Sequence, residues 1–178
     1  MRTVHESAKF HVTGEAKYIN DLLVNEQLLH GYLYTSPFAS AKIKSFDLSK
    51  AKKVKGIHAI LTYKDIKGEN QVGAIIHDEP ALAENEVNFV GQAIFLIAAE
   101  NEEAAIKAKS LIKIEFEERE PVITIKDAIK KKQLLHPTRK IELGKPDSAF
   151  KKAPNFIEGE FESGAQEHWY LETQVALC

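Results

Sequence analysis

Ala93-Ile94-Phe95-Leu96-Ile97-Ala98-Ala99 is the stretch that decides the fold, because it is the most continuous apolar run in the chain. A short apolar run of this length is typical of a strand that is covered on both faces. We therefore expect it to form the central strand of a sheet.

The residues that follow this strand have the pattern of an amphipathic helix. Asn101 is a good N-cap, and the two glutamates after it favour the helix dipole. One face carries the apolar side chains at helical spacing: Ala104, Ala105, Ala108, Leu111 and Ile112. Another strand is expected next, with Ile114 and Phe116 pointing to one side, and it is expected to continue through residues 121–123.

Three more strands are predicted upstream, at residues 28–35, 41–46 and 57–62, from their alternating or aromatic and aliphatic composition. A short helix is expected between the last two, at residues 47–55. Strand, helix and strand thus occur twice along the chain. This order predicts two split βαβ units.

Turn residues mark the ends of these elements. Ser49 is the expected N-cap of the short helix, and Gly56 lies just past its end. Thr62 is expected to cap a single helical turn, with Asp65 three residues later as in a capping box.

The stretch 67–86 is rich in turn residues and predicts a long surface loop, with a short strand at residues 73–76. Beyond the last strand, Thr124 opens a further helix with capping-box spacing. That helix is expected to end in the three lysines at 130–132.

The C-terminal part predicts a second unit. Residues 133–142 have no periodicity and are expected to form a linker, and Pro146 marks the start of a short helix. Residues 155–164 alternate as a strand, and 171–178 form a second, apolar one. Because a domain seldom ends on an apolar strand, we expect the chain to be the front part of a longer protein or one piece of a split subunit.

Composition excludes several classes of protein. The chain has 178 residues, 44% of them hydrophobic and 28% charged, which is typical of an ordinary globular protein. A net charge of -2 predicts no general attraction to nucleic acid or to an anionic membrane. The single cysteine excludes a disulfide framework and cysteine ligation of an iron–sulfur cluster within the chain. No signal peptide or membrane span is recognised, so a cytoplasmic location is expected.

The segment Ser163-Gly164-Ala165-Gln166-Glu167-His168-Trp169-Tyr170-Leu171-Glu172-Thr173-Gln174 carries the most unusual chemistry. It places an amide, a carboxylate, an imidazole, an indole and a phenol side by side in a strand-like run. Each of these polar groups needs a partner if it is buried. We expect His168 and Glu172 to be structural. Without a family resemblance, Gln166 would be interpreted as a strand-edge amide.

This segment resembles the Gly-Gln-Glu-His-Phe-Tyr-Leu-Glu-Thr signature of the molybdenum hydroxylases, the xanthine dehydrogenase and aldehyde oxidase family. Two positions differ, because Ala165 stands where the family has glycine and Trp169 where it has phenylalanine. In the family the glutamine lies beside the molybdenum of molybdopterin and hydrogen-bonds one of its oxygen ligands. The resemblance therefore implies that Gln166 is a cofactor-binding residue.

Other phrases extend the resemblance over nearly the whole chain, in the family's order: Val54-Lys55-Gly56-Ile57-His58-Ala59-Ile60-Leu61-Thr62, Phe89-Val90-Gly91-Gln92 and Ile114-Glu115-Phe116-Glu117-Glu118. It implies an α+β fold: an α/β hammerhead domain with a mixed sheet and short helices at residues 14–132, after a flexible leader at 1–13. The linker 133–142 then leads to the first strands of a truncated molybdopterin-binding domain at 143–178.

The resemblance also implies the chemistry. The family hydroxylates a carbon next to nitrogen in a heterocycle, or an aldehyde carbon, at a molybdenum centre, with iron–sulfur clusters and FAD on other subunits or domains. The glutamate base of the family lies beyond residue 178, so no catalytic residue is assigned to this chain. We expect it to be the N-terminal portion of a molybdenum-binding subunit that acts on a purine, inactive alone and part of an oligomer. The alternative is a non-catalytic hammerhead module, or a gene remnant, that docks subunits.

Other polar groups have simpler interpretations. His77-Asp78-Glu79 suggests a metal site, but a solvated loop is favoured because consecutive side chains diverge. Gly91-Gln92 is either a second amide near the cofactor or, as favoured here, a bulge before the central strand. The lysines at 130–132 fit the C-terminal end of a helix better than an anion site.

Overall fold

The computed structural model describes residues 5–22, 28–168 and 174–178 of the chain. It divides into two compact units. One unit is Asn25–Gln133, and the other joins Met1–Val24 to Leu134–Cys178.

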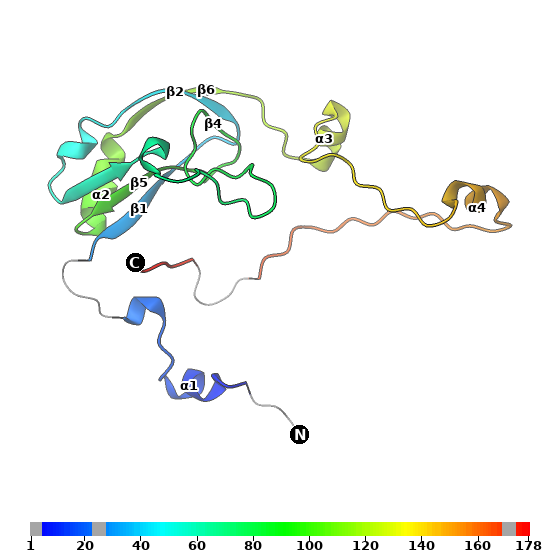
Figure 1. The fold of residues 1–178 in the computed structure, drawn as a ribbon, viewed down its shortest axis with the longest axis horizontal. Coiled ribbons are helices and arrows are strands. Elements are labelled where there is room, and N and C mark those ends of the chain that lie inside the picture. Colours follow the sequence, from blue (N-terminus) through cyan, green and yellow to red (C-terminus); the bar gives the residue numbers. More distant parts are fainter. Residues whose placement is uncertain (1–4, 23–27, 169–173) are drawn as a thin grey trace. The chain divides into compact units, whose positions relative to one another are not determined.

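The 25–133 unit contains most of the regular structure (Figure 1). Its strands are β1 (His30–Thr35), β2 (Ala41–Asp47), β3 (Ile57–Leu61), β4 (Glu86–Val87), β5 (Ala93–Ala99) and β6 (Lys113–Glu118). Its helices are α2 (Glu102–Leu111), α3 (Ile125–Lys131) and the short 3-10 helices η2 (Ala51–Lys53) and η3 (Tyr63–Asp65).

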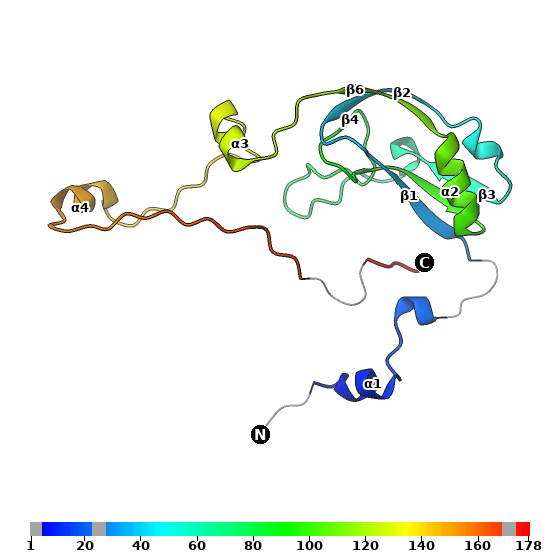
Figure 2. The ribbon, with the colours of Figure 1, turned by 180° about the vertical axis from the view of Figure 1, so that it is seen from behind.

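The strands form two three-stranded sheets, in the orders β1-β5-β3 and β4-β2-β6. Every strand pair in them is antiparallel, so the mixed sheet that the resemblance implied is not found among the described strands. Strand β5 is the central strand of the first sheet, as its apolar run predicts, and α2 packs against this sheet (Figure 2). The α+β class expected from the sequence is confirmed.

The core of the unit is built around Phe95, which is 1% exposed. Its ring contacts those of Tyr34 and Phe46, with centroids 5.7 Å and 5.0 Å away. Such aromatic pairs stabilise a core beyond the area that they bury. The other fully buried large side chains are Ile94, Ile97 and Val87.

Local sequence explains how α2 joins β5. The Asn101 side chain accepts a hydrogen bond from the Ala104 backbone N–H at 2.9 Å, so the predicted N-cap is confirmed. The turn before β3 packs closely against the start of α2 at Gly56, whose φ is +86°. A Cβ there would lie 3.3 Å from that of Ala104, so both the backbone angle and the close approach favour glycine.

The two predicted βαβ units are wrong, because the two strands of each unit lie in different sheets. Strands β2 and β3 belong to different sheets, and so do β5 and β6. Only nine residues separate β2 from β3, and a parallel crossover takes a dozen or more. Strand β5 already has β1 and β3 on its two edges, which leaves β6 to pair with β2.

Three further expectations in this unit are corrected. No strand forms at 73–76, where the chain turns so tightly that a Cβ on Gly73 would clash with the Ile76 carbonyl oxygen; the short strand is β4 instead. The helix at 47–55 shrinks to η2, because the Ser49 N–H donates to the Asp47 side chain and Ser49 does not cap. Residues 121–123 form no strand, and Pro121 lacks the N–H that a ladder needs.

The second unit holds three short helices: α1 (Ala8–Thr13), the 3-10 helix η1 (Ile19–Asp21) and α4 (Pro146–Lys152). The leader therefore contains α1, and the proline-started helix is confirmed. The strand expected at 155–164 is wrong, because these residues are exposed and pair with no described strand. Of the second expected strand, 174–178 are not in a strand and 171–173 lie outside the described residues. Within the described part of the chain, no helix is both long and apolar enough to cross a membrane.

Candidate functional site

Gln166 lies on an exposed segment without regular structure. The neighbouring Glu167 carboxylate accepts a hydrogen bond from the His168 backbone N–H at 2.9 Å. A Cβ placed on Gly164 would meet open space, so the backbone there is not crowded. Within the described residues, the Gln166 amide is therefore free to bind an external group. Trp169, Tyr170 and Glu172 lie outside the described residues.

Gln92 is a buried amide, 5% exposed, in the turn before β5. Its side-chain oxygen accepts a hydrogen bond from the Asn88 backbone N–H at 2.7 Å, and its own backbone N–H donates to the Phe89 carbonyl. The turn also needs Gly91, whose φ of +93° suits glycine. The side-chain oxygen of Gln92 is thus committed to holding the turn.

The same turn is tied to the residue after β1. The Ser36 N–H donates to the Gln92 carbonyl, and the Gly91 N–H donates to the Ser36 carbonyl, both at 2.8 Å. Ser36 is itself 2% exposed, and its hydroxyl donates to the Phe38 carbonyl. The sequence left Gly91-Gln92 as either a second amide for the cofactor or a bulge. The geometry supports a turn that is hydrogen-bonded to Ser36, just after β1. The irregularity in strand pairing lies next to it, where the register between β1 and β5 shifts at Tyr34 and Thr35.

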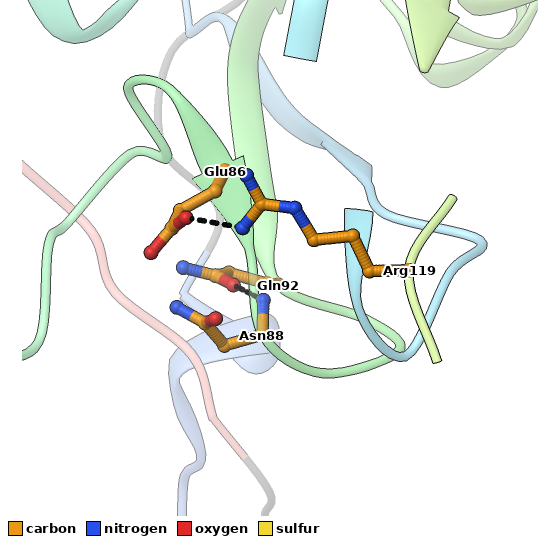
Figure 3. A network of polar contacts seen from close by, with 4 residues as sticks. All are labelled: Glu86, Asn88, Gln92 and Arg119. Carbon is orange, nitrogen blue, oxygen red and sulfur yellow. Dashed lines mark hydrogen bonds and ion pairs between the residues drawn. The ribbon is translucent and has the colours of Figure 1, made fainter. Parts of the chain in front are cut away.

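An ion pair lies next to this turn (Figure 3). Arg119 Nη1 donates to Glu86 Oε2 at 2.9 Å, and Figure 3 shows the Gln92 amide between the Glu86 carboxylate and Asn88. Both charged side chains are about half exposed, so the pair contributes only about 0–1 kcal/mol to stability. Its effect is to join the end of β6 to β4.

The long loop 67–86 is closed at its base by one side chain. Asn70 Nδ2 donates to the Leu82 carbonyl at 2.8 Å, and Asn70 Oδ1 accepts from the Leu82 N–H at 3.0 Å. Inside the loop, the Val72 N–H donates to the Glu79 carbonyl. This closure was not predicted, although an asparagine in a turn-rich segment is a signal for side-chain to backbone bonds.

The stretch His77-Asp78-Glu79 lies in this loop. His77 Nδ1 lies 2.9 Å from Glu69 Oε1 in an exposed pair, and Asp78 and Glu79 do not join it. Across the described residues, no group of three histidine, cysteine, aspartate or glutamate side chains could hold a metal ion. The three side chains are exposed in this loop.

Perturbed ionisation occurs at structural positions. Hydrogen bonds from the Thr62 backbone N–H and hydroxyl lower the pKa of Asp65, and the predicted capping box is confirmed. The Ser49 backbone N–H lowers the pKa of Asp47 in the same way. Burial raises the pKa of Tyr34, which stays neutral beside Phe95.

Comparisons with known proteins give one answer. Residues 13–120 match the model of the family described as aldehyde oxidase and xanthine dehydrogenase, a/b hammerhead domain. Aldehyde oxidase 2 of Macaca fascicularis is 44% identical over 98% of this chain, and xanthine dehydrogenase/oxidase of Gallus gallus is 38% identical over the same share. The chain spans 13% of the length of each of these relatives.

Solved structures agree on the fold. The aldehyde oxidoreductase of Desulfovibrio desulfuricans is similar with a TM-score of 0.64 and 29% identity, over 70% of this chain and 15% of that one. A structure of a Cu,Mo-CO dehydrogenase gives a TM-score of 0.63 and 26% identity, over 71% of this chain and 16% of that one. All four proteins are thus several times longer than the 178-residue chain.

Proposed function

This chain belongs to the aldehyde oxidase and xanthine dehydrogenase family and carries its hammerhead domain, and from this premise we propose that it is the N-terminal portion of the molybdenum-binding subunit of a hydroxylase. One observation carries the proposal. The alignment with both relatives covers 98% of the chain and is not limited to the hammerhead domain. The segment around Gln166 is therefore related to theirs as well.

In this proposal Gln166 donates a hydrogen bond from its side-chain amide to an oxygen ligand of the molybdenum. The exposed amide and the open backbone at Gly164 fit a donor to a group supplied from outside the described residues. When bound, molybdopterin supplies the redox chemistry of hydroxylation, and the protein orients it. The residues described here offer no ligand cluster, so the chain's own contribution is an outer hydrogen bond.

The proposed partners are the remaining part of the molybdenum subunit and the subunits or domains that hold iron–sulfur clusters and FAD. We place the assembly in the cytoplasm as an oligomer. The proposed substrate is a purine, on the resemblance of the hammerhead phrases. Relatives named aldehyde oxidase and xanthine dehydrogenase match at 44% and 38% identity, so an assay has to compare a purine with an aldehyde.

The test is to co-express the 178-residue chain with the remaining polypeptide of the enzyme and to purify on a tag at Met1. Molybdenum is measured by mass spectrometry, and turnover is measured with xanthine and with an aldehyde. We expect metal in a stable complex, and Gln166→Ala is expected to lower turnover or metal content by about 10–100-fold. The matched control is Gln133→Ala, at an exposed glutamine outside the signature, and it is expected to behave as wild type.

The alternative is a non-catalytic hammerhead module that docks other subunits. One observation favours it: all the strands among the described residues lie within the 25–133 unit, so the scaffold is complete without the cofactor-side segment. A chain that binds its partners but is free of metal would support this alternative. A chain that emerges alone and metal-free would overturn the proposed enzyme subunit.

A further inference from the structure

Strand β1 has a free edge, because β5 pairs with one side of it and no described strand pairs with the other. A free edge exposes backbone N–H and C=O groups that can pair with another strand. Protein edges are commonly protected by charged side chains, bulges or shortness. The six residues of β1, His30–Thr35, include no lysine, arginine, aspartate or glutamate.

The other edges are protected. Strand β4 has two residues, and β6 carries four charged ones: Lys113, Glu115, Glu117 and Glu118. Strand β3 also has no lysine, arginine, aspartate or glutamate, but it bulges at His58, because Ile57 pairs with Ala99 and Ala59 with Ala98. Where β1 pairs with β5, Tyr34 pairs with Phe95 and Thr35 with Ala93. The extra residue therefore belongs to β5, and β1 itself has no bulge. Strand β1 is therefore the edge that remains open to pairing.

An open groove of about 660 Å³ runs between β1 and α2. Tyr32 and Tyr34 of the strand line one wall, and Ile106 and Lys109 of the helix line the other. Ile106 is 49% exposed although it is apolar, and Lys109 Nζ lies 5.1 Å from the centroid of the Tyr32 ring. A strand edge beside a helix groove is the arrangement in which an extended segment adds to a sheet and places alternate side chains in pockets.

The charge of the groove restricts the occupant. Among the described residues that line it, Lys109 is the basic one and none is acidic, and burial raises the pKa of the Tyr34 phenol. An acidic side chain next to an apolar one would satisfy both Lys109 and Ile106. Pairing of two copies through β1 would instead bring two positively charged grooves together, so it is disfavoured.

We propose that an extended segment with alternating apolar and acidic side chains adds to β1 as a fourth strand of the first sheet. Its source is the polypeptide of the larger enzyme outside these 178 residues, since the chain spans 13% of the length of its relatives. This inference rests on the proposed function, in which the chain assembles with the remaining molybdenum subunit.

The experiment compares hydrogen–deuterium exchange of the 178-residue chain alone with that of the same chain co-expressed with the remaining polypeptide. We expect the amides of β1 to become protected in the complex, and those of β3 to change little. No added protection of β1 in a complex that holds molybdenum would overturn the inference and leave the proposed function intact. No complex and no metal would overturn both, and β1 protected in a homodimer of the chain alone would overturn the assigned occupant.

Two pairs of variants sharpen the test. Lys109→Glu is expected to weaken the complex about tenfold, whereas Lys107→Glu, on the same helix but outside this groove, is expected to leave it unchanged. Ile106→Asp is expected to act like Lys109→Glu, with Ile75→Asp, at a 90% exposed position, as its control. Thermal unfolding confirms that each variant is folded. If the groove variant and its control weakened the complex equally, the result would contradict binding in the groove.

Discussion

The side-chain oxygen of Gln92 accepts a hydrogen bond from the backbone N–H of Asn88 at 2.7 Å, across four residues of a turn that leads into the central strand. The buried side-chain amide of Gln92 thus supplies the acceptor that the Asn88 N–H would otherwise need from the backbone. Because β5 forms the centre of the first sheet, the turn fixes where this strand starts. Stability should therefore depend on the amide and not only on the size of the side chain.

Replacing Gln92 by methionine tests this dependence. Methionine has a similar length but no hydrogen-bond acceptor of comparable strength, so the Asn88 N–H loses its partner. We expect the free energy of unfolding to fall by about 1–3 kcal/mol, measured by urea denaturation. Gln133→Met, at an exposed site, is expected to stay within about 0.5 kcal/mol of wild type.

Phe95→Ala is expected to lower the free energy of unfolding more than Gln92→Met does. The ring is 1% exposed and contacts two other rings, so its removal leaves a cavity as well as losing buried area. The expected loss is about 3–5 kcal/mol in denaturation experiments. Phe89→Ala is the control, because this ring is 58% exposed; a loss of the same size there would contradict the assigned core.

Asn70→Ala is expected to loosen the long loop without unfolding the sheets. The change removes two hydrogen bonds to Leu82, both at the base of the loop. Limited proteolysis should then cut within residues 71–81 faster than in wild type, while the melting temperature changes little. Asn88→Ala, which leaves the backbone bond to Gln92 in place, should not speed up cleavage in that loop.

Asp65 should make the unit sensitive to acid. Its pKa is lowered in the folded state, mainly by the Thr62 backbone N–H, so its stabilising effect is present above the unfolded pKa of 3.8. That effect is lost as the pH falls through the lower, folded-state pKa. Asp65→Asn has no carboxylate to protonate, so it should not lose this stability in acid. The difference in stability between wild type and Asp65→Asn should therefore be larger at about pH 6 than at about pH 2. Urea midpoints at both pH values measure this.

The matched control for that experiment is Asp78→Asn, since this carboxylate lies in the exposed loop. It should keep the acid sensitivity of wild type. A wild-type protein whose advantage over Asp65→Asn grows toward low pH would contradict the sign of the linkage.

Local signals in the sequence predicted most of the elements. Caps at Asn101, Thr62 and Thr124 were identified because a side chain and its backbone partner lie within three residues. The apolar run at 93–99 predicted the central strand, because its burial depends on composition. The strand pairing was predicted wrongly, as two βαβ units, because which edge of β5 receives which strand depends on contacts between residues far apart in sequence.

The candidate site divides in the same way. Gln166 follows from a motif, and its role stays a prediction because the partner that it needs lies outside the described residues. The strand expected at 155–164 was wrong although its alternation is clear, since a strand also needs a neighbour for its backbone groups. The groove beside β1 could not be seen in the sequence, because Tyr32 and Lys109 lie in elements joined only by the fold.

The order of the strands also sets when the unit can fold during synthesis. Strand β1 ends at Thr35, and its partner β5 ends at Ala99, so an aromatic and uncharged strand leaves the ribosome with nothing to pair with. At ordinary translation rates it waits on the order of seconds for that partner. Strand β2 can pair earlier with the two-residue β4, but its longer pairing with β6, near residue 118, takes longer still. A nascent chain of this protein should therefore depend on chaperones that shield extended apolar segments, and slowing translation between β1 and β5 should increase aggregation.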